Sequence, residues 1–135
     1  MKSIPQDDPL QATAEGWLAY QRSVRTDAVG ARVDSDNEDL FSFTIQVDDL
    51  VRHRPEAAWF AIQLIFLKCA SDLERACLAA GPLEDLLAKH GAAFIDRVEL
   101  AASTDPGFKE LLTGVWQSGI DPPIWERIQR VIQSD

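Results

Sequence analysis

Proline marks the places where helices are expected to begin in this chain. Five X-Pro steps stand directly before stretches whose apolar residues recur with a helical period. Proline is tolerated in the first turn of a helix because the N–H that it lacks would have no partner there. In three steps the residue before proline is Asp, whose carboxylate can cap the free N–H groups of that turn. The steps are Asp8-Pro9, Arg54-Pro55, Gly81-Pro82, Asp105-Pro106 and Asp121-Pro122.

Other signals predict further helix boundaries. The run Ser71-Asp-Leu-Glu74 has the form of a capping box and predicts one more helix start. Gly81 and Gly91 predict helix ends, since glycine readily adopts the left-handed conformation that terminates helices. The first helix is expected from Pro9 to about Ser23. Residues 24–37 are rich in Asp, Gly, Ser and Asn and predict a mobile acidic loop.

One segment is ambiguous. Residues 41–47 alternate between apolar and polar side chains, which taken alone is typical of a strand. The same region also fits a helical period, and a lone strand would have no partner to pair with. We therefore predict a helix here. The apolar residues that fit the helical period are Leu40, Phe43, Val47, Leu50 and Val51.

The remaining pattern is helical to the end of the chain. Residues 57–67 are apolar on nearly all sides, as expected of a central helix surrounded by others. Phe108, Leu111, Leu112, Val115 and Trp116 form one continuous stripe in a later helix. We predict a single all-α domain of 135 residues, folded as a compact orthogonal bundle or a short solenoid of seven to eight short helices.

The net charge of the protein limits the kinds of molecule that we expect it to bind. The formal net charge is −9, which argues against nucleic acid and anionic membranes, because both require a basic surface. The longest nearly apolar run, residues 57–67, is far shorter than the roughly 20 residues that cross a bilayer. The first residues lack the pattern of a secretory signal. We expect a cytoplasmic protein.

Signs of catalysis are weak. The chain has no phosphate-binding glycine loop, no nucleophile elbow and no zinc-site spacing among Cys69, Cys77, His53 and His90, so we expect no cofactor and no metal. We interpret the two cysteines as buried, reduced thiols. A carboxylate and histidine site at Glu84, Asp85 and His90 is the enzymatic alternative. The helix dipole also explains the positions of these residues, since acids are favoured at the start of a helix and cations at its end.

An acidic cluster is the most distinctive feature of the sequence. Six acids fall within residues 34–49, and no Lys or Arg lies among them. The repulsion between these charges can be relieved either by a basic partner or by water alone. Calcium fits poorly, because the glycine and distal Glu of an EF-hand loop are missing. Tryptophan is frequent at binding hot spots, although packing in the core also explains all four tryptophans of this chain. The predicted partner-binding residues are Asp34, Asp36, Glu38, Asp39, Asp48, Asp49, Trp116 and Trp125.

Several separated motifs resemble a known family. They are Gly81-Pro-Leu-Glu-Asp-Leu-Leu87, His90-Gly91, Phe94-Ile-Asp-Arg97, Asp105-Pro106, Phe108, Leu111-Leu112, Val115-Trp116 and Trp125. From about Asp48 to Ile128 the chain resembles a family of small bacterial helical domains of unknown function. The resemblance implies an all-α fold and no reaction.

We therefore expect a non-enzymatic protein-binding module. An acidic immunity or antitoxin-like protein that neutralises a basic toxin fits this size and charge, since electrostatic complementarity speeds association. A structural or adaptor subunit and the enzyme described above are the alternatives. The sequence does not identify the partner or the oligomeric state.

Overall fold

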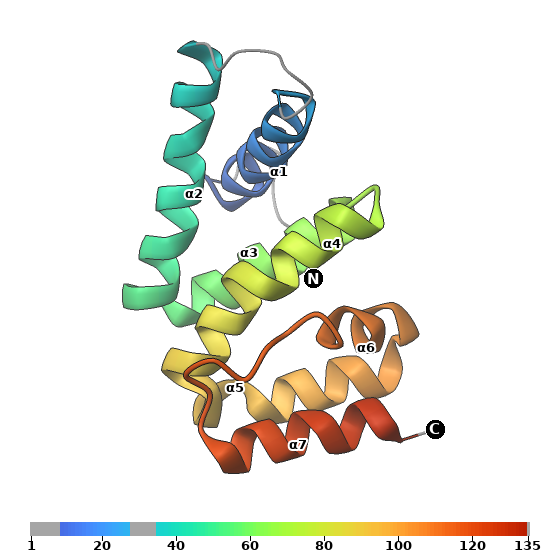
Figure 1. The fold of residues 1–135 in the computed structure, drawn as a ribbon. Helices are drawn as coiled ribbons and strands as arrows, with labels where there is room; N and C mark the ends of the chain where they lie inside the picture. The colour runs from blue at the N-terminus through green and yellow to red at the C-terminus, as the bar shows by residue number, and fades with distance from the viewer. Residues whose placement is uncertain (1–8, 28–34, 135) are drawn as a thin grey trace, which may run out of the picture. The chain divides into compact units, whose positions relative to one another are not determined.

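The computed structural model describes residues 9–27 and 35–134, with side chains for residues 9–23 and 40–134, and this part of the chain is helical with no strand. The helices are α1 (Pro9–Asp27), α2 (Ser35–His53), α3 (Pro55–Lys68), α4 (Asp72–Leu78), the π-helix η1 (Ala79–Leu83), α5 (Glu84–Thr104), α6 (Pro106–Leu112) and α7 (Pro122–Gln133) (Figure 1). The all-α prediction is confirmed. The ambiguous segment 41–47 lies inside α2 and is helical.

The predicted number of seven to eight short helices is wrong for the described residues. Because α4, η1 and α5 follow one another without a break, the described chain forms six separate helical segments. Gly81 does not end a helix, since the chain passes through it in the π-helical turn that also contains Pro82. A π turn shifts the hydrogen-bond pattern by one residue, which accommodates a proline that an α-helical interior would not.

Gly91 does not end a helix either. Helix α5 continues through it, with a kink at His90, where φ is −137° and ψ is 27°. Gly91 is buried, and a Cβ at this position would lie 3.1 Å from Cγ2 of Ile124 on α7. This glycine is therefore explained by the close approach of α7 to α5, which a larger residue would hinder.

The predicted loop at 24–37 is too long. Helix α1 extends to Asp27 and α2 begins at Ser35, so both ends of the predicted loop are helical. No glycine or proline interrupts residues 24–27, which explains why the first helix continues beyond Ser23. The rest of the predicted loop, residues 28–34, lies outside the described residues.

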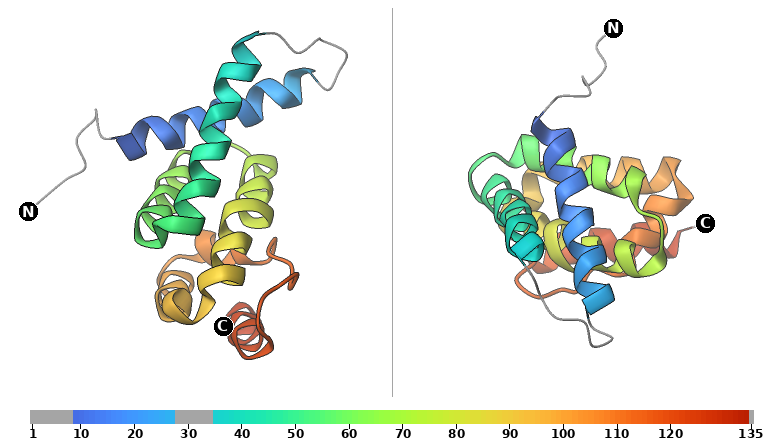
Figure 2. Two further views of the ribbon diagram at one scale, coloured as in Figure 1. Left: turned by 90° about the vertical axis from the view of Figure 1, so that its left-hand side faces the viewer. Right: turned by 90° about the horizontal axis from the view of Figure 1, so that it is seen from above.

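The chain divides into two compact units, Met1–Glu74 and Arg75–Asp135, and each is described by itself. The prediction of one single domain stays a prediction. In the first unit α1 crosses α2 rather than running parallel to it (Figure 2). Thr13 Oγ1 donates a 2.8 Å hydrogen bond to Gln46 Oε1 across this crossing.

Helix α3 supplies much of the core of the first unit. Trp59, Ile62 and Ile65 are buried, and so is Trp17 of α1. The expectation that α3 is covered on all sides is wrong, because Phe60 and Leu67 are exposed. Although apolar residues lie on nearly all sides of α3, only part of this helix is buried.

The helix start predicted at Ser71 is confirmed, with the Ser71 half of the capping box formed and the Glu74 carboxylate bonded to Ala70 instead of Ser71. The Glu74 backbone N–H donates to Ser71 Oγ at 3.1 Å, and Glu74 Oε1 accepts from the Ala70 N–H at 2.7 Å. Arg22 of α1 then binds both oxygens of the Glu74 carboxylate, at 2.7 and 3.1 Å, and donates to the Lys68 carbonyl. The hydrogen bond to Glu74 raises the pKa of Arg22. One guanidinium thus connects α1 to the turn between α3 and α4.

In the second unit α7 runs alongside the C-terminal half of α5 (Figure 1). The core of this unit includes Leu83, Leu86, Phe94, Ile95, Val98, Phe108, Leu112 and Ile128. Of the three predicted Asp caps, Asp105 is confirmed, since its Oδ1 accepts from the Gly107 N–H at 2.9 Å. Asp121 is the N-cap residue of α7, as predicted, but its side chain makes no capping hydrogen bond. Asp8 lies outside the described residues.

Candidate partner-binding surface

Helix α2 has two different apolar sides. Val47 and Val51 face the core and are almost fully buried, whereas Phe41 and Ile45 are 47% and 55% exposed. Phe41 and Ile45 are four residues apart and therefore lie one turn apart on one side of the helix. The same side continues to Asp48 and Asp49 at the next turn. We call Phe41, Ile45, Asp48 and Asp49 the outward face of α2.

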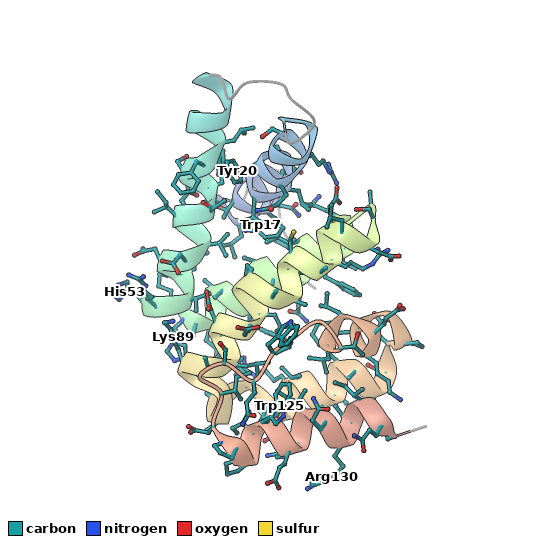
Figure 3. The ribbon with its side chains drawn as sticks, viewed as in Figure 1. Trp17, Tyr20, His53, Lys89, Trp125 and Arg130 are labelled. Atoms are coloured by element: carbon teal, nitrogen blue, oxygen red, sulfur yellow. The ribbon has the colours of Figure 1, made fainter. Side chains whose placement is uncertain are left out.

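Phe41 is held in place by a neighbouring ring. Tyr20 of α1 points toward α2, and its ring centroid lies 5.4 Å from that of Phe41, with the two planes tilted by 58° (Figure 3). A tilted pair at this distance is a favourable aromatic arrangement. The exposed phenyl ring therefore has a fixed position, which lowers the entropy cost of using it in a contact.

Each of the two described acids of the predicted cluster has a basic residue as a neighbour on its own helix. Asp48 lies 3.1 Å from Arg52, and Asp49 lies 3.7 Å from His53, each pair one helical turn apart. His53 points outward at the end of α2 (Figure 3). Exposed contacts of this kind are weak, so the carboxylates can exchange these neighbours for the cationic side chains of a partner.

The structure describes no side chain of the other four predicted acids. Asp34 lies outside the described residues. Asp36, Glu38 and Asp39 fall in the first two turns of α2, where only the backbone is described. Negative side chains are favoured near a helix N-terminus, so helix stability explains part of the cluster without a partner.

The two predicted tryptophans belong to the second unit, not to the unit of the acids. Trp125 on α7 is half-buried. Trp116 is 72% exposed, although its backbone N–H donates a 3.0 Å hydrogen bond to Glu84 Oε1. The predicted helical stripe of residues 108–116 is therefore wrong at its last two members. Helix α6 ends at Leu112, and beyond it Val115 is still buried whereas Trp116 is exposed.

Among the residues of the enzymatic alternative, Glu84 has a structural contact. Glu84 accepts the Trp116 N–H, as described above, and His90 is half-buried at the kink of α5. Asp85 lies with Glu84 in the first turn of α5, where acids are favoured. The structure therefore gives no specific support to a carboxylate and histidine site.

A charged cluster joins α5 to α7. Arg127 donates to Glu99 Oε1 at 2.6 Å, to Glu99 Oε2 at 2.8 Å and to Asp96 Oδ1 at 2.7 Å. The hydrogen bond from Arg127 lowers the pKa of Glu99, and the two carboxylates raise the pKa of Arg127. One guanidinium thus binds two carboxylates of α5, and these contacts connect α5 to α7.

Within the described residues no group of three or more His, Cys, Asp or Glu side chains is arranged to hold a metal ion. Cys69 and Cys77 are free thiols, and both are half-buried, not fully buried as expected. They do not share one helix, because α3 ends at Lys68 and α4 begins at Asp72. No helix among the described residues is both long and apolar enough to span a bilayer.

Phe41 and Ile45 were not among the predicted site residues. The signal that could have found them is the helical period itself. Once Val47 and Val51 are assigned to the core, large apolar residues that fall off that stripe are expected at the surface. An exposed aromatic residue beside an exposed Ile is more informative about binding than a single exposed apolar side chain.

Comparisons with known proteins give a family but no activity. A model described as a family of unknown function (DUF6869) matches residues 31–135. No curated protein and no solved structure matches the chain. The match includes all of α2, so the outward face of α2 lies within the family domain.

Proposed function

This chain belongs to that family of unknown function, and we propose that it is a non-enzymatic protein-binding module whose outward face of α2 takes a basic partner. The observation that carries the proposal is the pair of large exposed side chains, Phe41 and Ile45, on a helix whose opposite side is buried. Burying such side chains against a partner removes apolar surface from water, which favours association.

Charge determines which partner fits this face. Phe41 and Ile45 are followed by Asp48 and Asp49 and preceded in the sequence by four further acids, in a protein of net charge −9. A partner segment with an apolar residue flanked by Lys or Arg would match both the exposed apolar side chains and the negative charge of this face. Complementary charge raises the association rate and disfavours acidic partners. The finer proposal is that this partner is a basic toxin domain, neutralised as immunity proteins or antitoxins do.

Affinity capture with matched variants tests the proposal. We expect the immobilised wild-type protein to capture a basic protein, identified by mass spectrometry, and to lose it as the salt concentration rises. Capture should fall in a Phe41→Ser, Ile45→Ser variant and in a variant with Asp34→Asn, Asp36→Ser, Glu38→Gln and Asp39→Asn. Leu100→Ser is the control, because Leu100 is similarly exposed but lies in the second unit. Capture that is equal in all variants contradicts the proposal.

A further inference from the structure

The segment between α6 and α7 carries Trp116, whose side chain is exposed and whose backbone N–H is bonded to Glu84. It passes along the N-terminal part of α5 (Figure 1), and its two ends are fastened by the buried side chains of Val115 and Ile120. The Val115 N–H donates to the Leu112 carbonyl at 3.1 Å and the Ile120 N–H to the Gln117 carbonyl at 2.6 Å. Between these points Trp116 is exposed and held by Glu84.

The tightness of this segment depends on one glycine. Gly119 has a φ of +78°, the left-handed region that other residues rarely adopt, and a Cβ there would lie 3.5 Å from Cβ of Ala88 on α5. A turn held in this way limits the conformations of its neighbours. The indole is thus presented without the entropy cost of ordering a flexible loop.

Between Lys109 and Arg127 the charged residues around this tryptophan are all acidic. Residues 110–126 include Glu110, Asp121 and Glu126 and no Lys or Arg, and Glu84 is bonded to Trp116 itself. The hydrogen bond from Trp116 uses Glu84 Oε1, and a carboxylate can accept further hydrogen bonds at its second oxygen. Because the backbone of Trp116 lies within hydrogen-bond distance of Glu84, a cation that contacts the exposed indole can also be attracted by this carboxylate, so the ring and the charge both favour it.

We propose that Trp116 and Glu84 form a binding site for an arginine side chain of a partner protein. Arginine fits better than lysine, because its planar guanidinium can stack on an indole while its edge donates to a carboxylate. This inference rests on the proposed function, since it supplies the chemistry of the partner, but it uses a surface in the other compact unit.

The test uses a nona-arginine peptide as the probe and a nona-lysine peptide of equal charge as its comparison. The indole N–H signals of the full-length protein are followed by NMR, and that of Trp116 is assigned by its loss in Trp116→Phe. We expect the arginine peptide to shift the Trp116 signal and to leave those of the buried Trp17 and Trp59 unchanged. We expect the lysine peptide to bind more weakly, since its ammonium cannot stack.

Two variants make the result specific. Trp116→Leu should weaken binding of the arginine peptide about two- to fivefold, the range expected for loss of an exposed cation–π contact. Glu84→Gln keeps an acceptor for the Trp116 N–H but removes the charge, and should reduce the preference for arginine over lysine. The matched variant Asp48→Asn, Asp49→Asn should leave the Trp116 shift as it is.

The outcomes separate this inference from the proposed function. An unshifted Trp116 signal, or equal binding of the two peptides, overturns the arginine site. If the arginine peptide perturbs only amides of α2, the site at Trp116 fails while the proposed function stands. If Trp116 responds as expected but partner capture is indifferent to the α2 variants, the proposed function fails and the arginine site stands.

Discussion

The ring of Phe43 on α2 lies directly against the backbone of Gly16 on α1, in the space that a Cβ at residue 16 would need. This contact lies at the crossing of α1 and α2, and α2 carries the proposed binding face. Glycine is unfavourable in a helix interior, so its use here is explained by the ring above it. The crossing is therefore the first feature to test.

We expect Gly16→Ala to destabilise the protein in spite of the better helix propensity of Ala. The gain from propensity is about 1 kcal/mol, while displacing a packed ring costs about 1–3 kcal/mol. In a Phe43→Ala background the same change should become stabilising, because the obstacle is gone. Urea denaturation of the four proteins measures this cycle. A Gly16→Ala variant that is more stable in both backgrounds would contradict the described crossing.

Gly81→Ala is the matched control for that cycle. Nothing lies within 4 Å of a Cβ at this position, and its φ is not positive. We expect a gain of about 0.4–1 kcal/mol in the free energy of unfolding, since Ala restricts the unfolded chain. A loss of stability in the same urea experiment would show that the π-helical turn requires glycine for a reason other than space.

The two Asp-Pro helix starts of the second unit should differ in their response to the same substitution. Asp105 accepts a hydrogen bond from the Gly107 N–H, whereas the side chain of Asp121 makes no capping bond. We expect Asp105→Ala to lower the free energy of unfolding by about 1 kcal/mol, and Asp121→Ala to have a much smaller effect. Thermal denaturation of both variants checks this, and equal losses would be inconsistent with the assigned caps.

The cluster of Arg127, Asp96 and Glu99 predicts a pH dependence of stability. Because Arg127 lowers the pKa of Glu99 below its ordinary value of 4.5, the folded state binds its proton more weakly than the unfolded state does. The contribution of Glu99 is therefore present above pH 4.5 and is lost as the pH falls through the lower folded value.

Glu99→Gln should accordingly be slightly less stable than wild type near neutral pH, and the difference should shrink in acid. The effect is small because the pair is partly exposed and screened by water. Denaturation curves of both proteins at about pH 7 and about pH 3 measure it. A difference that grows toward low pH would have the wrong sign for a lowered pKa.

Much of the fold followed from the sequence because helix starts are local chemistry. Asp105 before proline and Ser71 three residues before Glu74 satisfy N–H groups with atoms only a few residues away, and both caps are present. The periodicity of Val47 and Val51 likewise identified a helix against the alternation of residues 41–47. Sequence patterns that depend on contacts within one helical turn therefore gave the reliable predictions.

Helix ends and exposure were less predictable because they depend on residues distant in sequence. Gly91 was expected to end a helix, yet it is explained by the side chain of Ile124, 33 residues later. Trp116 was predicted to continue an apolar helical stripe, although the chain leaves the helix at Leu112 and the Trp116 N–H is bonded instead to Glu84. The outward position of Phe41 and Ile45 was missed although the helical period of α2, with Val47 and Val51 assigned to the core, indicates it.

The most direct test of the central claim is the affinity of the captured basic partner for the wild-type protein and for the Phe41→Ser, Ile45→Ser variant, measured by isothermal titration calorimetry. We predict that the variant remains folded by circular dichroism and binds at least about tenfold more weakly, as expected when two apolar contact residues are lost. A folded variant with the dissociation constant of the wild type would contradict the claim that the outward face of α2 is the binding surface.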